Sequence, residues 1–319
     1  MSEAPTVERG GGEGRVAIAG AGLMGSQIGC EYALGGWAVS WLVRDTAAAE
    51  GRVEGALALA LRHGIADAAA VRAARARMRF CGSAPELAGE GEPELIVESL
   101  PEDIGVKAAV LGPLCALYPA AVLASNTSSI SITALGEAAG AAGRTLGAHY
   151  WNPPLLMALV EIVAAEGTPA RTLEMLESDL RALGKRPVRL AQEVPGMLWN
   201  RLQLAVLREC LWLVESGVAT PSAIDEVMRD GLARRWRLTG PFETVGLGGA
   251  ATFDAIAANL FPLLSKADVG SGFAAHVPHD PKLLAELRER RDAALAAELR
   301  AERPCTLYRL IDMAPGSKT

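Results

Sequence analysis

A histidine and a glutamate twelve positions apart are the side chains best suited to acid–base chemistry. His149 ends an apolar run, and Glu161 lies inside a second apolar run at 159–163. A carboxylate in such a run is costly to bury unless it is paired, and a strand–turn–strand connection would bring it beside the imidazole. The pair suits general acid–base catalysis, because a carboxylate orients the ring and stabilises its charged form. A structural hydrogen bond that holds the turn is equally compatible with the sequence.

Two further polar groups are candidates for the same site. The island Ser125-Asn126-Thr127-Ser128-Ser129 directly follows the apolar residues 122–124. This puts it at the carboxyl end of a strand, where α/β proteins bind ligands, although such a cluster is also typical of a helix cap. Asn200 opens a helix after Pro195-Gly196 and could reach back across the cleft. An amide on an amphipathic helix indicates nothing by itself.

A glycine-rich turn near the start of the chain is typical of a dinucleotide site. An apolar run from Val16 leads into Gly20-Ala21-Gly22-Leu23-Met24-Gly25, and residues 26–34 have the pattern of a helix. Gly20 permits a tight turn, Gly22 lets the backbone approach a pyrophosphate, and Gly25 lets helix and strand pack closely. The helix N-terminus adds N–H groups and partial positive charge. A strand-to-helix turn without a ligand is the alternative, and the surrounding elements disfavour it.

The order of elements predicts an α/β protein with an N-terminal Rossmann-like, doubly wound, mostly parallel sheet and an all-helical C-terminal domain. Short apolar runs alternate with helical segments up to about residue 190, and only helical spacing follows. We expect a disordered leader at 1–14, a dinucleotide-binding Rossmann domain at 15–192 and a helical domain at 193–319. The predicted strands are 16–19, 38–43, 78–81, 95–98, 120–125, 146–151, 157–163 and 186–190.

Composition restricts the partners and the compartment. The net charge of −6, without a basic stripe, argues against a nucleic-acid partner, and no apolar run is long enough to span a membrane. The five scattered cysteines form no zinc spacing, so we expect reduced thiols, no metal and a cytoplasmic location. The run from Leu202 to Val214 has more apolar surface than a small domain should expose, which predicts a homodimer through the helical domain.

Together these motifs resemble the 3-hydroxyacyl-CoA dehydrogenase family over roughly residues 15–250. The resemblance implies a nicotinamide cofactor, a helical dimerisation domain and hydride transfer to or from a secondary alcohol. The matching motifs, in the family's order and at near-identical spacing, are Gly20–Gly25, Glu98–Lys107, Ser125–Ser129, His149–Glu161, Pro195–Leu202 and Gly240-Pro241-Phe242-Glu243.

The resemblance also assigns roles to individual residues. His149 matches the family's general base, and Glu161 matches the carboxylate that orients it. Ser128 and Asn200 match the polar groups that hold the base and the reacting oxygen of the substrate. Three positions that line the cofactor site in the family are matched by Glu102, Lys107 and Asn126.

One departure from the family concerns the cofactor. The acid expected at the end of the second strand, which accepts from the adenosine ribose, falls on Val43, and Arg44 and Asp45 follow. A lost carboxylate and a gained guanidinium would suit the 2′-phosphate of NADP. Alternatively, Asp45 still reaches the ribose while Arg44 stacks on the adenine. NAD and NADP are therefore both open.

A second departure concerns the substrate. The serine and lysine that serve coenzyme A in the family fall near Leu59 and Ala66, and a further lysine is replaced by Ala158. The C-terminal half looks closer to the L-gulonate 3-dehydrogenase (lambda-crystallin) and carnitine dehydrogenase branch. In that branch an arginine matching Arg235 helps to hold a small polar substrate, and Arg235 could pair with a carboxylate. A solvated or interface arginine is the alternative, since Arg234 adjoins it.

These expectations combine into an NAD(P)-dependent oxidoreductase that acts on the CH–OH group of a 3-hydroxy acid or related small polar substrate and forms a 3-oxo product. His149 serves as general acid and base. One alternative is an L-3-hydroxyacyl-CoA dehydrogenase that acts on CoA thioesters. Another is a protein that binds the cofactor but has a structural or regulatory role without catalysis.

Overall fold

The computed structural model describes residues 14–268 and 272–302, so the predicted leader at 1–14 lies, apart from Gly14, outside the described residues. Among the described residues, those up to Met197 and those from Leu287 onward form one compact unit, and Leu198–Glu286 forms a second. The predicted domain boundary at 192 and 193 stays a prediction. No helix in the described ranges has both the length and the apolar character needed to cross a membrane.

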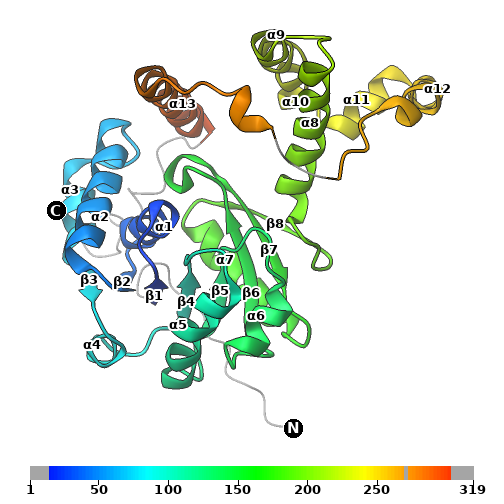
Figure 1. Cartoon of the computed structure of the whole chain (residues 1–319). Coiled ribbons are helices and arrows are strands. Elements are labelled where there is room, and N and C mark those ends of the chain that lie inside the picture. Colours follow the sequence, from blue (N-terminus) through cyan, green and yellow to red (C-terminus); the bar gives the residue numbers. More distant parts are fainter. Residues whose placement is uncertain (1–13, 269–271, 303–319) are drawn as a thin grey trace, which may run out of the picture. The chain divides into compact units, whose positions relative to one another are not determined.

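The first unit is built on one sheet of eight strands within the described part of the chain (Figure 1). Its order is β3-β2-β1-β4-β5-β6-β7-β8, and every neighbouring pair is parallel except β6 and β7. The predicted mostly parallel α/β fold is thereby confirmed. The strands are β1 Arg15–Ala19, β2 Ala38–Leu42, β3 Met78–Cys81, β4 Leu95–Glu98, β5 Val122–Ser125, β6 Thr145–Tyr150, β7 Leu159–Ala164 and β8 Arg186–Arg189.

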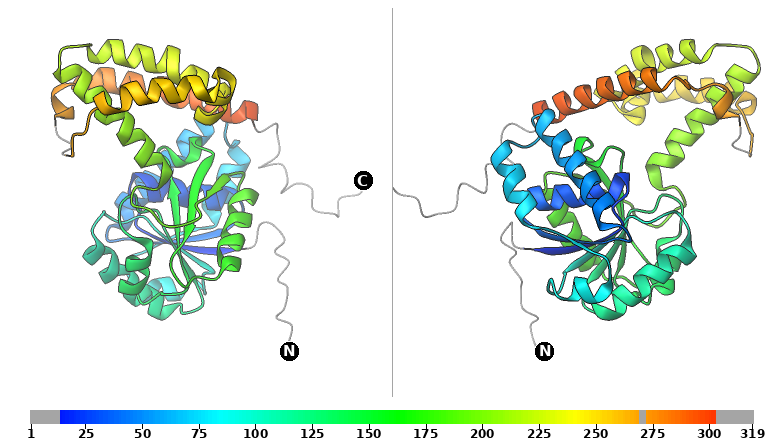
Figure 2. Two further views of the ribbon diagram at one scale, coloured as in Figure 1. Left: turned by 90° about the vertical axis from the view of Figure 1, so that its right-hand side faces the viewer. Right: turned by 60° about the vertical axis from the view of Figure 1, so that its left-hand side comes forward.

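Helices cover both faces of this sheet (Figure 2). Successive side chains of a strand point to opposite faces, so apolar strands need a covering layer on each face. In β1, Val16 and Ile18 belong to an apolar cluster that includes residues of α1, α2, α3 and α7, whereas Ala17 and Ala19 belong to a second cluster with residues of α4, α5 and α6. The helical elements of this unit, with one short 3-10 turn, are α1 Leu23–Leu34, α2 Thr46–Arg62, α3 Ala68–Ala76, α4 Ala84–Ala88, α5 Ile104–Leu117, α6 Ile132–Ala138, η1 Pro154–Leu156 and α7 Ala170–Ala182.

The last described helix, α13 (Pro281–Glu302), adds its C-terminal part to the first unit. Ala296 and Leu299 are buried in the same apolar cluster as α1 and α2. The Arg300 guanidinium donates to the His63 carbonyl at the end of α2, and Arg62 and Glu289 form an exposed ion pair at 3.4 Å. Apolar packing of Ala296 and Leu299, with the polar contacts of Arg300 and Glu289, therefore holds this helix against the N-terminal helices.

The second unit consists of helices in its described residues, as the sequence predicts. Thr244 is the one buried residue among the described residues of Leu198–Glu286. Several of its large apolar side chains are mostly exposed, with Phe242 at 90%, Leu238 at 82% and Leu247 at 79%. Its elements are α8 Met197–Glu215, α9 Pro221–Glu226, the π-helical η2 Val227–Leu232, α10 Ala233–Leu238, α11 Pro241–Gly248, α12 Ala250–Leu260, η3 Phe261–Leu263, η4 Phe273–Ala275 and the start of α13.

Candidate active site

The glycine turn between β1 and α1 has the geometry of a phosphate cradle. Gly20 has φ +97°, and a Cβ there would lie 2.5 Å from the Ser99 carbonyl oxygen. A Cβ at Gly25 would overlap the Gly20 carbonyl, whereas the space around position 22 is open to 4 Å. Helix α1 begins at Leu23, three residues earlier than predicted, and Gly22 caps it without a side-chain hydrogen bond. Its first N–H groups therefore fit an approaching pyrophosphate.

The loop after β2 carries the residues predicted to meet the adenosine ribose. Gly20 N donates to the Leu42 carbonyl over 3.1 Å, so the end of β2 adjoins the glycine turn. Val43 is half-buried and Arg44 is exposed. Asp45 caps α2, and its Oδ1 accepts from Ala48 N at 2.9 Å. Asp45, the acid of this loop, therefore serves as a helix cap. The cofactor contacts of Arg44 and Asp45 stay predictions.

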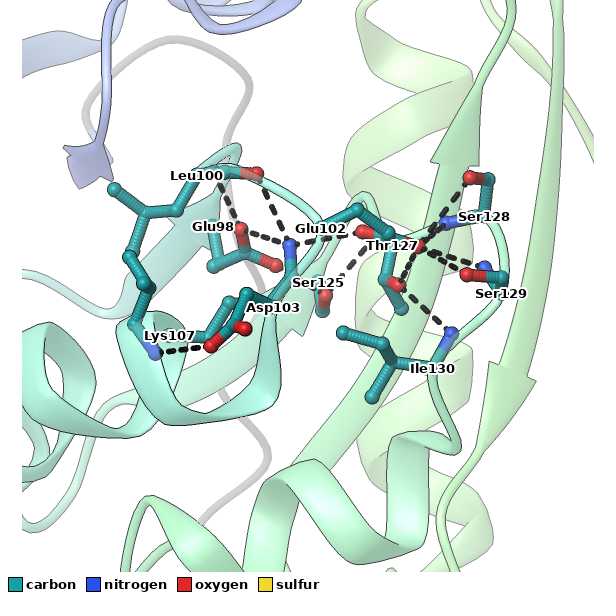
Figure 3. Close-up of polar contacts among 11 residues, drawn as sticks. Glu98, Leu100, Glu102, Asp103, Lys107, Ser125, Thr127, Ser128, Ser129 and Ile130 are labelled. Atoms are coloured by element: carbon teal, nitrogen blue, oxygen red, sulfur yellow. Dashed lines mark hydrogen bonds and ion pairs between the residues drawn. The ribbon is translucent and has the colours of Figure 1, made fainter.

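A fully buried ion pair lies where β4 ends (Figure 3). Lys107 Nζ, on α5, lies 2.6 Å from Glu98 Oε1, and the two side chains are 1% and 0% exposed. The other Glu98 oxygen accepts from Ser125 Oγ at 2.5 Å, and Oε1 also accepts from Leu100 N at 2.5 Å. Each carboxylate oxygen thus has a donor, as a buried charge requires.

Glu102 joins this pair to the Ser/Thr island. Its Oε2 lies 3.2 Å from Lys107 Nζ, and its Oε1 accepts from Thr127 Oγ1 at 2.5 Å. The same Oε1 also accepts from the N–H groups of Ser128 and Ser129, at 2.9 and 2.8 Å. Burial raises the pKa of Glu102, but hydrogen bonds from Thr127 and Ser129 and the Lys107 charge outweigh it and lower the pKa to about 2. Glu102 is therefore an anion that shapes this turn.

Asn126 connects the island to the strand that carries the candidate base. Its N–H donates to the Glu98 carbonyl over 2.9 Å, and its Oδ1 accepts from Tyr150 N at 2.8 Å. Tyr150 directly follows His149 in β6. Because β1, β4, β5 and β6 are parallel, their carboxyl ends meet at one edge of the sheet. The glycine turn, the island and His149 therefore lie along the same edge.

His149 and Glu161 form the predicted pair. They face each other in the antiparallel register of β6 and β7, and both are buried. His149 Nδ1 lies 2.7 Å from Glu161 Oε2, and Trp151 Nε1 donates to the same oxygen over 3.3 Å. A carboxylate only accepts, so Nδ1 of the neutral ring carries the proton and Nε2 keeps its lone pair. The pair can therefore accept a proton at Nε2 and stabilise the resulting charge.

A second buried ion pair, which the sequence analysis missed, supports the loop after His149. Lys185 Nζ lies 2.6 Å from Glu31 Oε1 on α1, and it donates to the Pro154 and Met157 carbonyls at 2.7 and 2.8 Å. All four groups therefore hold η1 against α1. The available signal was a lysine between a helix-ending Gly184 and a strand, together with a glutamate inside an apolar helix.

The remaining predicted residues belong to the second unit. Asn200 is half-buried on α8. Arg235 is exposed on α10, the helix that directly follows the π-helical η2. The structure brings the other predicted site residues together at the sheet edge of the first unit. The catalytic, cofactor and substrate roles of all these residues stay predictions.

Comparison with known proteins places this geometry in a family context. Residues 15–194 match the model described as "3-hydroxyacyl-CoA dehydrogenase, NAD binding domain", and residues 196–269 match that of the C-terminal domain of the same family. L-carnitine dehydrogenase of Streptomyces coelicolor is 34% identical over 248 residues, which cover 74% of this chain and 73% of that protein. Lambda-crystallin of Oryctolagus cuniculus is 32% identical over 216 residues, which cover 63% of this chain and 68% of that protein.

A solved structure agrees with these matches. The crystal structure of 5-formyl-3-hydroxy-2-methylpyridine 4-carboxylic acid 5-dehydrogenase, described as an NAD+ dependent dismutase, superposes with a TM-score of 0.80 and 27% identity. The superposition covers 90% of this chain and 97% of that chain. The predicted relationship, including the lambda-crystallin and carnitine dehydrogenase branch, is confirmed by these matches.

The buried Glu98–Lys107 pair generates a prediction about stability. Lys107→Met should lower the free energy of unfolding by about 3–5 kcal/mol, because it leaves the Glu98 carboxylate buried without its cation. Urea denaturation followed by circular dichroism measures this. The exposed Lys282→Met serves as control and should change stability by less than about 0.5 kcal/mol. The double variant Glu98→Gln/Lys107→Met should recover part of the loss, and equal effects of Lys107→Met and the control would contradict the prediction.

Proposed function

Because the chain belongs to the 3-hydroxyacyl-CoA dehydrogenase family, we propose that it is an NAD-dependent dehydrogenase that interconverts a small 3-hydroxy acid and its 3-oxo form. The buried pair of His149 Nδ1 and Glu161 Oε2, 2.7 Å apart, carries this proposal. The pair lies at the same sheet edge as the glycine turn that fits a dinucleotide. The chain's named relatives include L-carnitine dehydrogenase, which supports a small polar substrate.

His149 handles the proton of the reacting alcohol. Its Nε2 accepts the hydroxyl proton during oxidation and returns it during reduction, while the negative charge of Glu161 stabilises the imidazolium. The bound nicotinamide supplies the redox chemistry by accepting or giving a hydride. Ser128, at the same end of the sheet, holds the substrate oxygen near His149, and the substrate role of Asn200 stays a prediction. Glu102 orients Ser128 by accepting both its N–H, at 2.9 Å, and its hydroxyl, at 3.3 Å.

The proposed substrate is not a CoA thioester. The positions that would serve coenzyme A are apolar, since Ala66 and Ala158 are buried and Leu59 is half-buried. None of the three side chains has a donor for a phosphate oxygen. Arg235 instead offers a planar guanidinium that pairs with a carboxylate through two hydrogen bonds.

The role of His149 leads to a test by substitution. His149→Gln should lower kcat by a factor of about 10²–10⁴, because the side chain can no longer take the proton, and NADH affinity should be unchanged. Stopped-flow absorbance of the reduced cofactor measures turnover, and fluorescence titration measures NADH binding. The exposed His279→Gln is the matched control. Near-normal turnover of His149→Gln would exclude the proposed mechanism.

The substrate class is tested through Arg235. We expect turnover in a screen of hydroxy acids, including carnitine and gulonate, and little with 3-hydroxybutyryl-CoA. Arg235→Met should raise KM for a carboxylate substrate roughly tenfold or more, because a charge-assisted pair is lost. Arg234→Met is the control, since Arg234 is an exposed neighbour of the same charge. Equal effects of both variants would assign Arg235 to the solvent or to an interface, and selective turnover of thioesters would favour the CoA-dependent alternative.

The proposal includes a homodimer formed through the second unit. Thr244 is the one buried residue among the described residues of this unit, so its helices have no apolar core of their own. Helices α8 and α11 carry several exposed large apolar side chains, among them Leu202 at 65% and Phe242 at 90%. Grouped exposed apolar side chains are typical of protein–protein interfaces. A second copy of the same helices would cover them symmetrically.

Light scattering after size-exclusion chromatography tests the dimer. The wild-type mass should be about twice the 33.3 kDa of the chain. Leu202→Glu should shift the protein toward the monomer, because it puts a charge into the apolar contact. Leu117→Glu, at an exposed apolar position of α5 in the first unit, is the control. A wild-type monomer that does not change with concentration would refute the dimer.

A further inference from the structure

An arginine that the sequence analysis did not single out contacts the glycine turn. Arg52, two turns into α2, donates from Nε to the Ala21 carbonyl over 2.6 Å. Ala21 lies between Gly20 and Gly22, so this guanidinium is held at the rim of the phosphate cradle. The contact uses Nε and does not occupy the two terminal nitrogens, which are the pair that binds two oxygens of one phosphate. Arg52 itself is exposed.

The rim on which Arg52 lies is also the rim where the adenosine ribose of a dinucleotide is recognised. Gly20 N donates to the Leu42 carbonyl, so the end of β2 and the glycine turn are neighbours. In NAD sites an acid at the end of this strand accepts from the ribose hydroxyls and repels a 2′-phosphate. Here that position is Val43, and Arg44 follows it on the same loop. The rim therefore has an apolar side chain where such sites have an anion, and a cation directly after it.

The neighbouring carboxylates are already engaged. Asp45 accepts from Ala48 N as the cap of α2. Glu54, two residues further along α2, lies 2.6 Å from Arg75 Nε, and Glu50 also pairs with Arg75. The acids that flank Arg52 in sequence are thus oriented toward α3, where Arg75 lies. Arg52 and Arg44 remain as the charges that meet an incoming anion at the rim.

We propose that Arg52 and Arg44 bind the 2′-phosphate of NADP(H), so that the chain accepts NADP(H) as well as NAD(H). This rests on the proposed dinucleotide site and adds a phosphate subsite to it. Arg52 is pre-positioned by the Ala21 carbonyl, which reduces the side-chain entropy lost on binding. Arg44 approaches from the loop after β2 as a second donor.

Calorimetric titration with two nicotinamide-free ligands isolates this subsite. Adenosine 2′,5′-bisphosphate and adenosine 5′-monophosphate differ only in the 2′-phosphate. Wild-type protein should bind the bisphosphate at least about tenfold more tightly. Arg52→Met, which keeps a long apolar stem, should remove about tenfold of that preference and leave the monophosphate affinity unchanged. Arg44→Ala should act in the same direction, and the exposed Arg72→Met on α3 is the charge-matched control.

Val43→Asp tests the subsite without altering the Arg52 contact. It restores the acid and should weaken the bisphosphate about tenfold by charge repulsion, with little effect on the monophosphate. Equal loss of both ligands in Arg52→Met would assign Arg52 to the pyrophosphate and overturn the proposal. A wild-type preference for the monophosphate would overturn it too, while retained NADH binding would leave the dehydrogenase proposal standing. Failure to bind NADH, NADPH and both fragments would refute the two proposals together.

Discussion

The need to pair buried carboxylates constrains this structure more than any other single requirement. Glu98 ends β4 with no solvent exposure, so each of its oxygens must find a donor inside the protein. Lys107 comes from α5 and Ser125 from the end of β5, and the ion pair therefore fixes a helix and two strands relative to one another. Ser125 Oγ also accepts from Thr127 N at 3.1 Å, which starts the turn that Glu102 completes. The turn is thereby held in place by the protein's own groups.

The pairing of buried carboxylates also determines the structure around His149. Glu161 is buried beside His149, and Glu31 is buried beside Lys185. The first pair depends on the antiparallel register of β6 and β7, which puts the two residues opposite each other, and the connection between these strands is too short for a parallel crossover. The second pair holds the loop between those strands, so His149 is fixed both by its strand and by the loop that follows it. A base held in this way needs little reorganisation when a substrate arrives.

The parts of the fold that follow a local rule were predictable from the sequence. Alternating apolar runs and helices indicated the sheet, and the short loop between His149 and Glu161 indicated their pairing. Lys185 and Arg52 were not found, because a lysine or arginine gives no sign in sequence of whether it contacts solvent, a carboxylate or a carbonyl. In α13, leucines and alanines are spread around the helix among many charged residues, so the pattern did not show that Ala296 and Leu299 pack with the first unit.

The two units differ in what their own residues can stabilise. The first has a continuous core on each sheet face, whereas the described residues of the second bury little beyond Thr244. Asn200 and Arg235, the proposed substrate ligands, both lie on helices of the second unit. Under the proposed dimer, the apolar surface that fixes these helices comes from another copy of the chain. The order of the helices that carry Asn200 and Arg235 is then linked by mass action to association, while the proposed dinucleotide site depends only on the first unit's core.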